Sequence, residues 1–250
     1  MLILLPPSEG KTAPADGTAV ELDALTHPDL ASARRRVGDA LVKVSGQRNA
    51  LTALGVGPSL ASEVERNTRL WDQPADAAAR VYTGVLFEAA QASTWSDGTL
   101  ERAAERVRII SALWGAVSPA DRIPAYRLSM STSLGRIGPL ASYWRQHLAS
   151  ELSHVADGRV IVDCRSSSYV AAWRPSGAPL LSVRVERELN GKRTVVSHMA
   201  KHTRGLLTGA LVTADAVAES PSDVADAART LDGVVDVALA PAELTIVVGG

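Results

Sequence analysis

The pattern of apolar positions predicts both strands and helices. The chain opens with an apolar run, Met1 to Leu5, which ends at Pro6-Pro7. We interpret this run as a core strand, because strands buried on both faces are short and continuously apolar. Val107 to Ser111 and Arg159 to Cys164 have the same β-branched, apolar character and predict two further strands.

Other segments carry helical or hairpin signals. Helices are expected over 29–44, 59–70, 99–106, 139–154, 202–212 and 222–231. Asn190-Gly191, a strong hairpin signal, predicts that 180–188 pairs antiparallel with 193–199. Two short strands are expected in 234–248, around Pro241. This order indicates an α+β (mixed α/β) fold over residues 1–250, one domain with a central mixed sheet flanked by helices.

Composition indicates an ordinary globular protein and excludes some kinds of site. With 250 residues, 46% hydrophobic, the chain can bury a substantial core. The lone Cys164 excludes an intrachain disulfide framework and a cysteine-rich zinc site. His198 and His202 have the spacing of two metal ligands on a helix, but no third ligand is visible, so we expect no metal and no cofactor. The opening run is too short for a membrane span or a signal sequence, and a cytoplasmic location is expected.

Charge is distributed unevenly along the chain. Residues 1–100 hold 9 basic and 12 acidic residues, residues 101–204 hold 16 and 8, and residues 205–250 hold 1 and 7. The basic middle segment suggests contact with an anionic ligand, either nucleic acid or a phosphorylated or carboxylated small molecule. The alternative is a solvated surface whose arginines pair with acids of the tail.

The loop after the first run carries candidate chemistry. Ser8, Lys11 and Thr12 could hold anionic oxygens together with backbone N–H groups. A true P-loop is disfavoured, because Leu5 stands where that motif needs glycine and two prolines lack N–H donors. The plainer alternative is a proline-stiffened loop with an incidental lysine.

Three other segments at element boundaries carry candidate chemistry. The segment 81–84 holds Tyr82, the segment 163–169 holds Asp163, Ser167 and Tyr169, and the segment 197–205 holds Lys201 and Arg204. Loops at the carboxyl ends of strands meet at one sheet edge. Lys11, Asp163, Lys201 and Arg204 are therefore expected to share one site for a small anionic ligand. In that site an enzyme would use Lys11, Asp163 or Lys201 as catalytic groups.

The segment 111–130 could form an exposed basic corner flanked by aromatic side chains. It contains Trp114-Gly115, Pro119 and Tyr126-Arg127. The alternative is that Trp114 and Tyr126 pack in the core, as such side chains more often do. A protein that binds only a protein partner would instead disperse all of these polar residues over its surface.

Six blocks in order carry a family resemblance. They are MLILLPPSEGKT at the N-terminus, VYTG at 81–84, SALWGAVSPADRIPAYRLSM at 111–130, the tryptophan helix around Trp144, VIVDCRSSSYV at 160–170, and SHMAKHTRGLL at 197–207. Together they make the chain resemble the YaaA family, also called the peroxide stress protein or UPF0246 family. The chain departs from the commoner SPAKT pattern with PPSEGKT, and its tail is acidic.

The resemblance implies a cytoplasmic protein of the peroxide stress response that limits iron-driven oxidative damage. It also implies sequence-independent binding of double-stranded DNA through a helix-hairpin-helix-like element beside a positively charged cleft. We match that element to Trp114, Gly115 and Pro119, with charge from Arg122, Arg127 and Arg136. An enzyme acting on a small anionic or nucleotide substrate remains the alternative.

Overall fold

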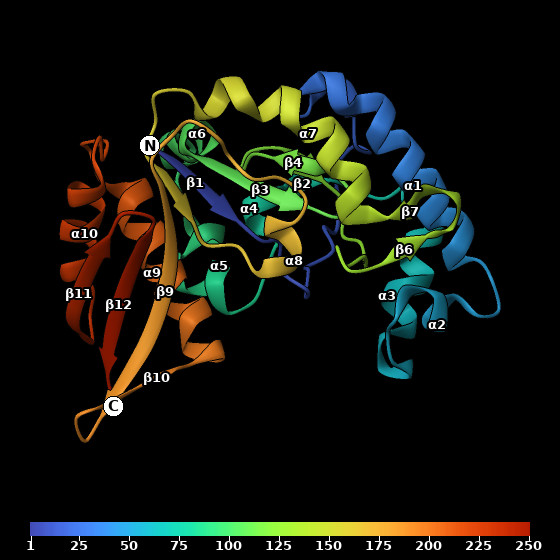
Figure 1. Cartoon of the computed structure of the whole chain (residues 1–250). Helices are drawn as coiled ribbons and strands as arrows, with labels where there is room; N and C mark the ends of the chain where they lie inside the picture. The colour runs from blue at the N-terminus through green and yellow to red at the C-terminus, as the bar shows by residue number, and fades with distance from the viewer.

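The fold is built around one eight-stranded mixed sheet, which extends from β11 at the left of Figure 1 to β4 near the centre. The structure, a computed structural model, describes residues 1–250 except for the side chains of residues 197 and 198. The strand order is β11-β12-β9-β8-β1-β3-β4, and β10 pairs with the outer part of β9. The strands are β1 (Leu2–Leu5), β3 (Val107–Ser111), β4 (Gly115–Val117), β8 (Ile161–Asp163), β9 (Leu180–Leu189), β10 (Lys192–Val195), β11 (Val234–Ala240) and β12 (Glu243–Gly249).

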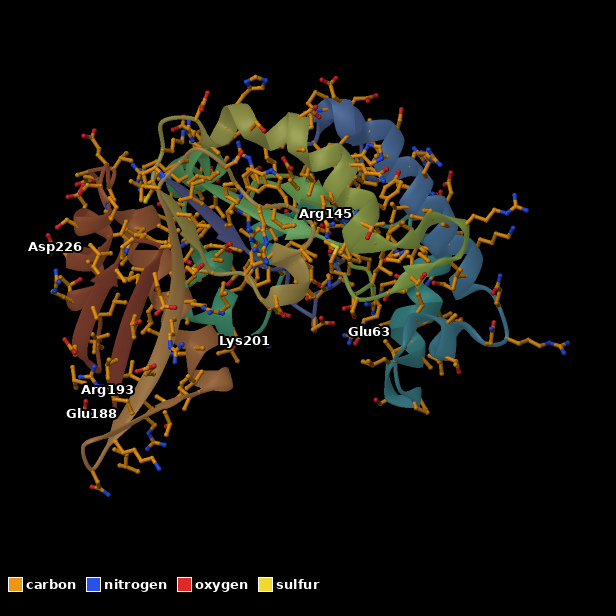
Figure 2. The ribbon with its side chains drawn as sticks, in the orientation of Figure 1. Glu63, Arg145, Glu188, Arg193, Lys201 and Asp226 are labelled. Atoms are coloured by element: carbon orange, nitrogen blue, oxygen red, sulfur yellow. The ribbon has the colours of Figure 1, made fainter. Side chains whose placement is uncertain are left out.

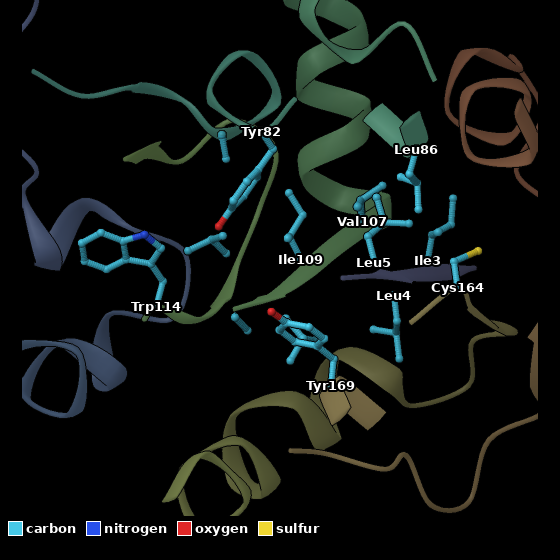
Figure 3. Close-up of a cluster of buried hydrophobic side chains, with 14 of the residues drawn as sticks. Ile3, Leu4, Leu5, Tyr82, Leu86, Val107, Ile109, Trp114, Cys164 and Tyr169 are labelled. Carbon is cyan, nitrogen blue, oxygen red and sulfur yellow. The ribbon is translucent and has the colours of Figure 1, made fainter. Parts of the chain in front are cut away.

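The five inner strands run parallel, and both edges are closed by antiparallel strands. β1 pairs parallel with β3 on one side and β8 on the other, placing Leu5 opposite Ile109 and Leu4 opposite Asp163. Every β1 residue is at most 2% exposed, as a strand covered on both faces requires. Figure 3 shows this strand at the centre of the apolar cluster, between Leu86 and Tyr169. The carboxyl ends of β1, β3 and β8 therefore share one edge of the sheet.

Helices cover both faces of the sheet. They are α1 (Ala31–Ser45), α2 (Ala50–Leu54), α3 (Ala61–Arg66), α4 (Ala78–Val81), α5 (Val85–Ala89), α6 (Asp97–Arg106), α7 (Leu140–Ala156), α8 (Ser167–Val170), α9 (Ser197–Thr213) and α10 (Pro221–Arg229). In Figure 1, α9 and α10 lie behind β9, β11 and β12, whereas α7 crosses the part formed by β1, β3 and β4. Within the described part of the chain, no helix is long and apolar enough to cross a membrane.

Short elements complete the chain. Two small sheets pair β2 (Asp76–Ala77) with β5 (Arg122–Ile123) and β6 (Ser133–Leu134) with β7 (Gly138–Pro139). The 3₁₀ turns are η1 (Leu22–Ala24), η2 (Pro28–Leu30), η3 (Pro58–Leu60), η4 (Asn67–Arg69), η5 (Ala92–Thr94) and η6 (Gly135–Ile137).

Most sequence-predicted elements are confirmed, and two boundaries are corrected. The mixed sheet flanked by helices and the hairpin at Asn190-Gly191 are present. The second hairpin strand ends at Val195 instead of Met199, and α9 already begins at Ser197. The reason is packing, because Ala200, Leu207 and Leu211 form a buried stripe with helical spacing. The expected helix over 59–70 is divided into η3, α3 and η4.

The segment matched to a helix-hairpin-helix is instead a buried β-hairpin, so that assignment is wrong. Ser111 of β3 pairs with Gly115 of β4, and Trp114 is fully buried in the turn between them. Gly115 has φ +74°, and a Cβ there would lie 2.6 Å from the Trp144 ring. The Trp144 indole donates a 2.7 Å hydrogen bond to the Ala112 carbonyl oxygen. Trp114 and Gly115 therefore serve core packing and lie too deep to contact DNA phosphates.

This packing predicts that Gly115→Ala destabilises the fold. Adding a methyl group at a left-handed residue in contact with Trp144 combines backbone strain with overpacking, together about 2–5 kcal/mol. Thermal or urea unfolding of the variant measures the loss. Gly98→Ala is the matched control, because a Cβ at Gly98 meets nothing within 4 Å. Equal stability of the two variants would contradict the packing described here.

Candidate functional site

A cavity of about 300 Å³ lies beyond the carboxyl ends of β1 and β8. Its walls come from the loop after β1, the start of α5, the turn after β8, α8 and the first half of α9. The lining residues are Pro6, Pro7, Ser8, Glu9, Gly10, Thr83, Gly84, Val85, Leu86, Phe87, Cys164, Ser166, Tyr169, Lys201 and Arg204. Four separate chain segments thus meet where a parallel sheet is expected to place a ligand site.

Close contact between α9 and α5 sets the width of this cavity. A Cβ at Gly205 would overlap the carbonyl oxygen of Leu86, and one at Gly209 would lie 3.2 Å from the Ala90 carbonyl oxygen. The two glycines, four residues apart, allow the backbones of α9 and α5 to approach each other. The helix therefore holds Lys201 and Arg204 beside the α5 wall.

Arg204 is held rigidly at the cavity wall. Its Nε and Nη2 atoms both donate to the Val183 carbonyl oxygen, Nε at 3.0 Å. The acceptor is a neutral carbonyl oxygen and the contact does not use Nη1, so this anchoring does not offset the charge of the guanidinium. Lys201, one turn earlier on α9, is exposed at the mouth of the cavity (Figure 2).

Lys11 shapes the loop and does not line the cavity. Its Nζ atom donates to the carbonyl oxygens of Ser8 at 2.8 Å and Glu9 at 3.3 Å. It lies over two aromatic rings, 4.2 Å from the centroid of Tyr126 and 5.5 Å from that of Tyr82. Burial lowers the pKa of Lys11 to about 7.

A chain of buried hydroxyls fixes the tyrosines below Lys11. The phenol oxygens of Tyr82 and Tyr126 are 2.9 Å apart, and the Ser111 hydroxyl lies 2.7 Å from that of Tyr126. Ser111 also accepts from the backbone N–H groups of Leu113 and Trp114. Burial raises the pKa of both phenols, so they stay protonated and serve as structural hydrogen-bond donors. Tyr82 therefore supports the loop and is not part of the cavity wall.

Asp163 is committed to a buried ion pair. Its two carboxylate oxygens accept from Arg165 Nε at 2.8 Å and Arg165 Nη2 at 2.7 Å, and both side chains are at most 4% exposed. Arg165 also donates to the Trp173 carbonyl oxygen at 2.8 Å, which ties the turn after β8 to the segment that follows α8. The expectation that Asp163 faces a shared pocket is therefore corrected: it lies at the same sheet edge but holds Arg165.

The structure brings together part of the predicted set. Ser8, Tyr169, Lys201 and Arg204 line the cavity, while Thr12 and Ser167 do not. Sequence reasoning missed the wall formed by Thr83 and Val85 to Phe87, although Gly84 marked that boundary. It also missed Ser166 and the cavity-facing position of Cys164.

A second cavity, about 410 Å³, lies on the other side of the loop after β1. It shares Glu9 with the first cavity and is lined by Arg127 and several hydroxyls, among them Thr52, Ser129 and Ser131. Arg127 lies 3.2 Å from Glu9 and 3.5 Å from Glu63.

Two arginines expected to bind DNA lie elsewhere. Arg122 is in β5, 3.6 Å from Asp76, and Arg136 is exposed in η6. Neither residue lines either of the two cavities.

Among the side chains that the structure describes, no three His, Cys, Asp or Glu residues come together as a metal site. The side chain of His198, half of the histidine pair weighed from the sequence, lies outside the described residues.

The Cys164 thiol is predicted to react slowly. Burial raises its pKa to about 12, about three units above that of an ordinary thiol, so about a thousandfold less thiolate exists at neutral pH. Labelling with a chromogenic disulfide at pH 7.5 should be slow for the native protein and fast in denaturant. Rapid labelling or rapid oxidation by peroxide in the native state would contradict this assignment.

Lys11 predicts a specific pH dependence of stability. Its pKa falls from 10.5 to about 7 on folding, so between these values the unfolded chain binds the extra proton and stability rises with pH. Melting temperatures of the wild type and Lys11→Met should be compared from pH 7 to 9.5. The melting temperature of the wild type should rise relative to that of Lys11→Met as the pH increases. Parallel plots of melting temperature against pH would show that Lys11 does not titrate in this window.

Comparison with known proteins agrees with the family resemblance carried by the sequence blocks. The family model described as peroxide stress protein YaaA matches residues 1–230. A UPF0246 protein of Streptomyces coelicolor is 37% identical over 92% of this chain and 90% of its own length. A UPF0246 protein of Corynebacterium efficiens is 38% identical over 92% of each chain, and one of Burkholderia lata is 28% identical over 85% of each. The chain therefore belongs to the peroxide stress protein YaaA family, the UPF0246 proteins.

Proposed function

We propose that this protein acts in the cytoplasm during peroxide stress by binding double-stranded DNA through its phosphates, without sequence preference. By covering DNA it would limit iron-driven oxidative damage. Membership of the peroxide stress family supports the first part of this proposal. The cationic side chains at the sheet edge beyond β1 and β8 support the binding mode.

The observation that carries the proposal is the pair of adjacent cavities that share Glu9. Lys201 and Arg204 lie on one side of the loop after β1, and Arg127 lies on the other. Figure 2 places Lys201 on α9 and Glu63 on α3, on the two flanks of this region. Cations along a hollowed surface favour a polyanion, because each phosphate contact releases counterions and needs no particular base.

Two carboxylates beside Arg127 compete with DNA phosphates for its guanidinium. Glu9 and Glu63 pair with Arg127 at 3.2 Å and 3.5 Å. A phosphate approaching Arg127 must displace one of these carboxylates, which weakens binding at that end. Lys201 is exposed, so it supplies the larger share of the attraction.

The proposal predicts that duplex affinity falls steeply with salt and depends little on sequence. Log K should fall linearly with log salt, with a slope of about −0.9 per phosphate contacted, and Lys201→Gln should reduce the slope by about 0.9. Fluorescence anisotropy with two unrelated duplexes at four salt concentrations measures both quantities. Arg159→Gln is the control for removal of one charge, because Arg159 precedes β8 at the opposite edge of the sheet. Binding that does not depend on salt, or equal effects of the two variants, would reject this surface as the DNA site.

A further inference from the structure

The first cavity combines features that bulk phosphate binding does not need. Its volume of about 300 Å³ is at the lower end of the range for small-molecule sites, roughly 300–1,000 Å³. Extended duplex DNA cannot enter a space of this size. A single small unit of an anionic ligand can.

One wall of the cavity is cationic. Arg204 is anchored by the Val183 carbonyl oxygen, and Lys201 lies at the mouth. Glu9 supplies the carboxylate in the lining. This carboxylate is paired at 3.2 Å with Arg127, a residue that does not line this cavity. The nearby Asp163 is occupied by Arg165. The positive charge is therefore left to be balanced by a ligand, and an anionic oxygen acceptor suits it best.

The other walls are apolar and planar. Pro6 and Pro7 close one side, Val85 and Phe87 form the α5 side, and Tyr169 lies on the far side of β1 from α5. The Phe87 ring packs against Tyr82 with centroids 5.3 Å apart, which keeps it in place. Such a surface favours a flat hydrophobic group, because planar rings stack on aromatic and proline faces.

Hydroxyl groups also line the cavity. Ser8, Thr83 and Ser166 can each donate or accept hydrogen bonds there. A ligand that joins a phosphate, a sugar and a planar base matches these three kinds of lining. A bare inorganic anion would leave the apolar walls unused.

We propose that this cavity binds one nucleoside monophosphate unit, with its phosphate at Lys201 and Arg204 and its base between Phe87, Tyr169 and the two prolines. The unit could be a free nucleotide or a single unstacked nucleotide of a DNA strand, since the two share this chemistry. Binding of a nucleotide that belongs to a DNA strand rests on the proposed function and deepens it. Binding of a free nucleotide does not depend on the proposed function.

Calorimetric titration of the full-length protein with dAMP, deoxyadenosine and inorganic phosphate tests the ligand class. We expect dAMP to bind at least tenfold more tightly than either fragment. Lys201→Gln should weaken dAMP about tenfold and leave deoxyadenosine unchanged. Ser166→Phe, which fills the cavity from an exposed position, should abolish binding of dAMP. Arg159→Gln should bind dAMP like the wild type.

A second arm distinguishes the source. Affinity for a duplex with a single-nucleotide bulge is compared with that for the matched duplex at the same salt concentration. A preference of about tenfold for the bulge, lost in Ser166→Phe, assigns the site to DNA, whereas dAMP binding without this preference assigns it to free nucleotides. The proposal is overturned if neither dAMP nor the bulge is preferred, or if phosphate binds as tightly as dAMP. Such a result would not affect the proposal of salt-dependent duplex binding. Conversely, a protein that does not bind duplex DNA could still bind dAMP, so the two proposals can be rejected independently.

Discussion

The complete burial of β1 is the constraint on which the rest of the fold depends. β1 is paired on both sides and covered on both faces, and Leu2 to Leu5 are all apolar and at most 2% exposed. The first polar side chains follow where the chain leaves the sheet, after Pro6 and Pro7. The loop that carries Ser8 and Lys11 is thereby delivered to the edge where β3 and β8 also end. The candidate site is a consequence of core formation at this strand.

The second constraint is the approach of α9 to α5. Gly205 and Gly209 remove the side chains that would separate the two backbones, and α5 is only five residues long. A short helix contributes little stability by itself, so α5 is held by its neighbours. Packing against α9 gives it a fixed position, and the same contact brings Arg204 and Phe87 into the lining of one cavity. The packing of α9 on α5 therefore also determines the geometry of the cavity wall.

The linear count of charge overstates the free cationic surface. Arg106, Arg108 and Arg165 of the basic middle segment are buried, and each donates to backbone carbonyl oxygens. Arg34, fully buried in α1, donates to the carbonyl oxygens of Trp114 and Ala116 and so holds the β3–β4 hairpin. Arg193 pairs with Asp236, as the alternative of pairing with the acidic tail expected. Arginines that act as internal cross-links cannot also attract DNA, which is why position in the fold decides the electrostatics.

Features that depend on residues close together in the sequence could be predicted, and features that depend on distant residues could not. The strand at 107–111, the Asn190-Gly191 hairpin and helix α7 depend on short-range periodicity and turn chemistry, and they were found. Gly115 was misinterpreted because a glycine beside a tryptophan has the same local pattern in an exposed corner as in a buried hairpin. The difference is Trp144, 29 residues further on, whose ring occupies the space a side chain would need.

Asp163 was placed at the correct edge but given the wrong partner, because nothing in the spacing DCR tells whether Arg165 turns back onto the carboxylate. Long-range packing therefore decides which of the polar residues at a sheet edge remain available to a ligand, and in this protein it selects Lys201 and Arg204 and withdraws Asp163.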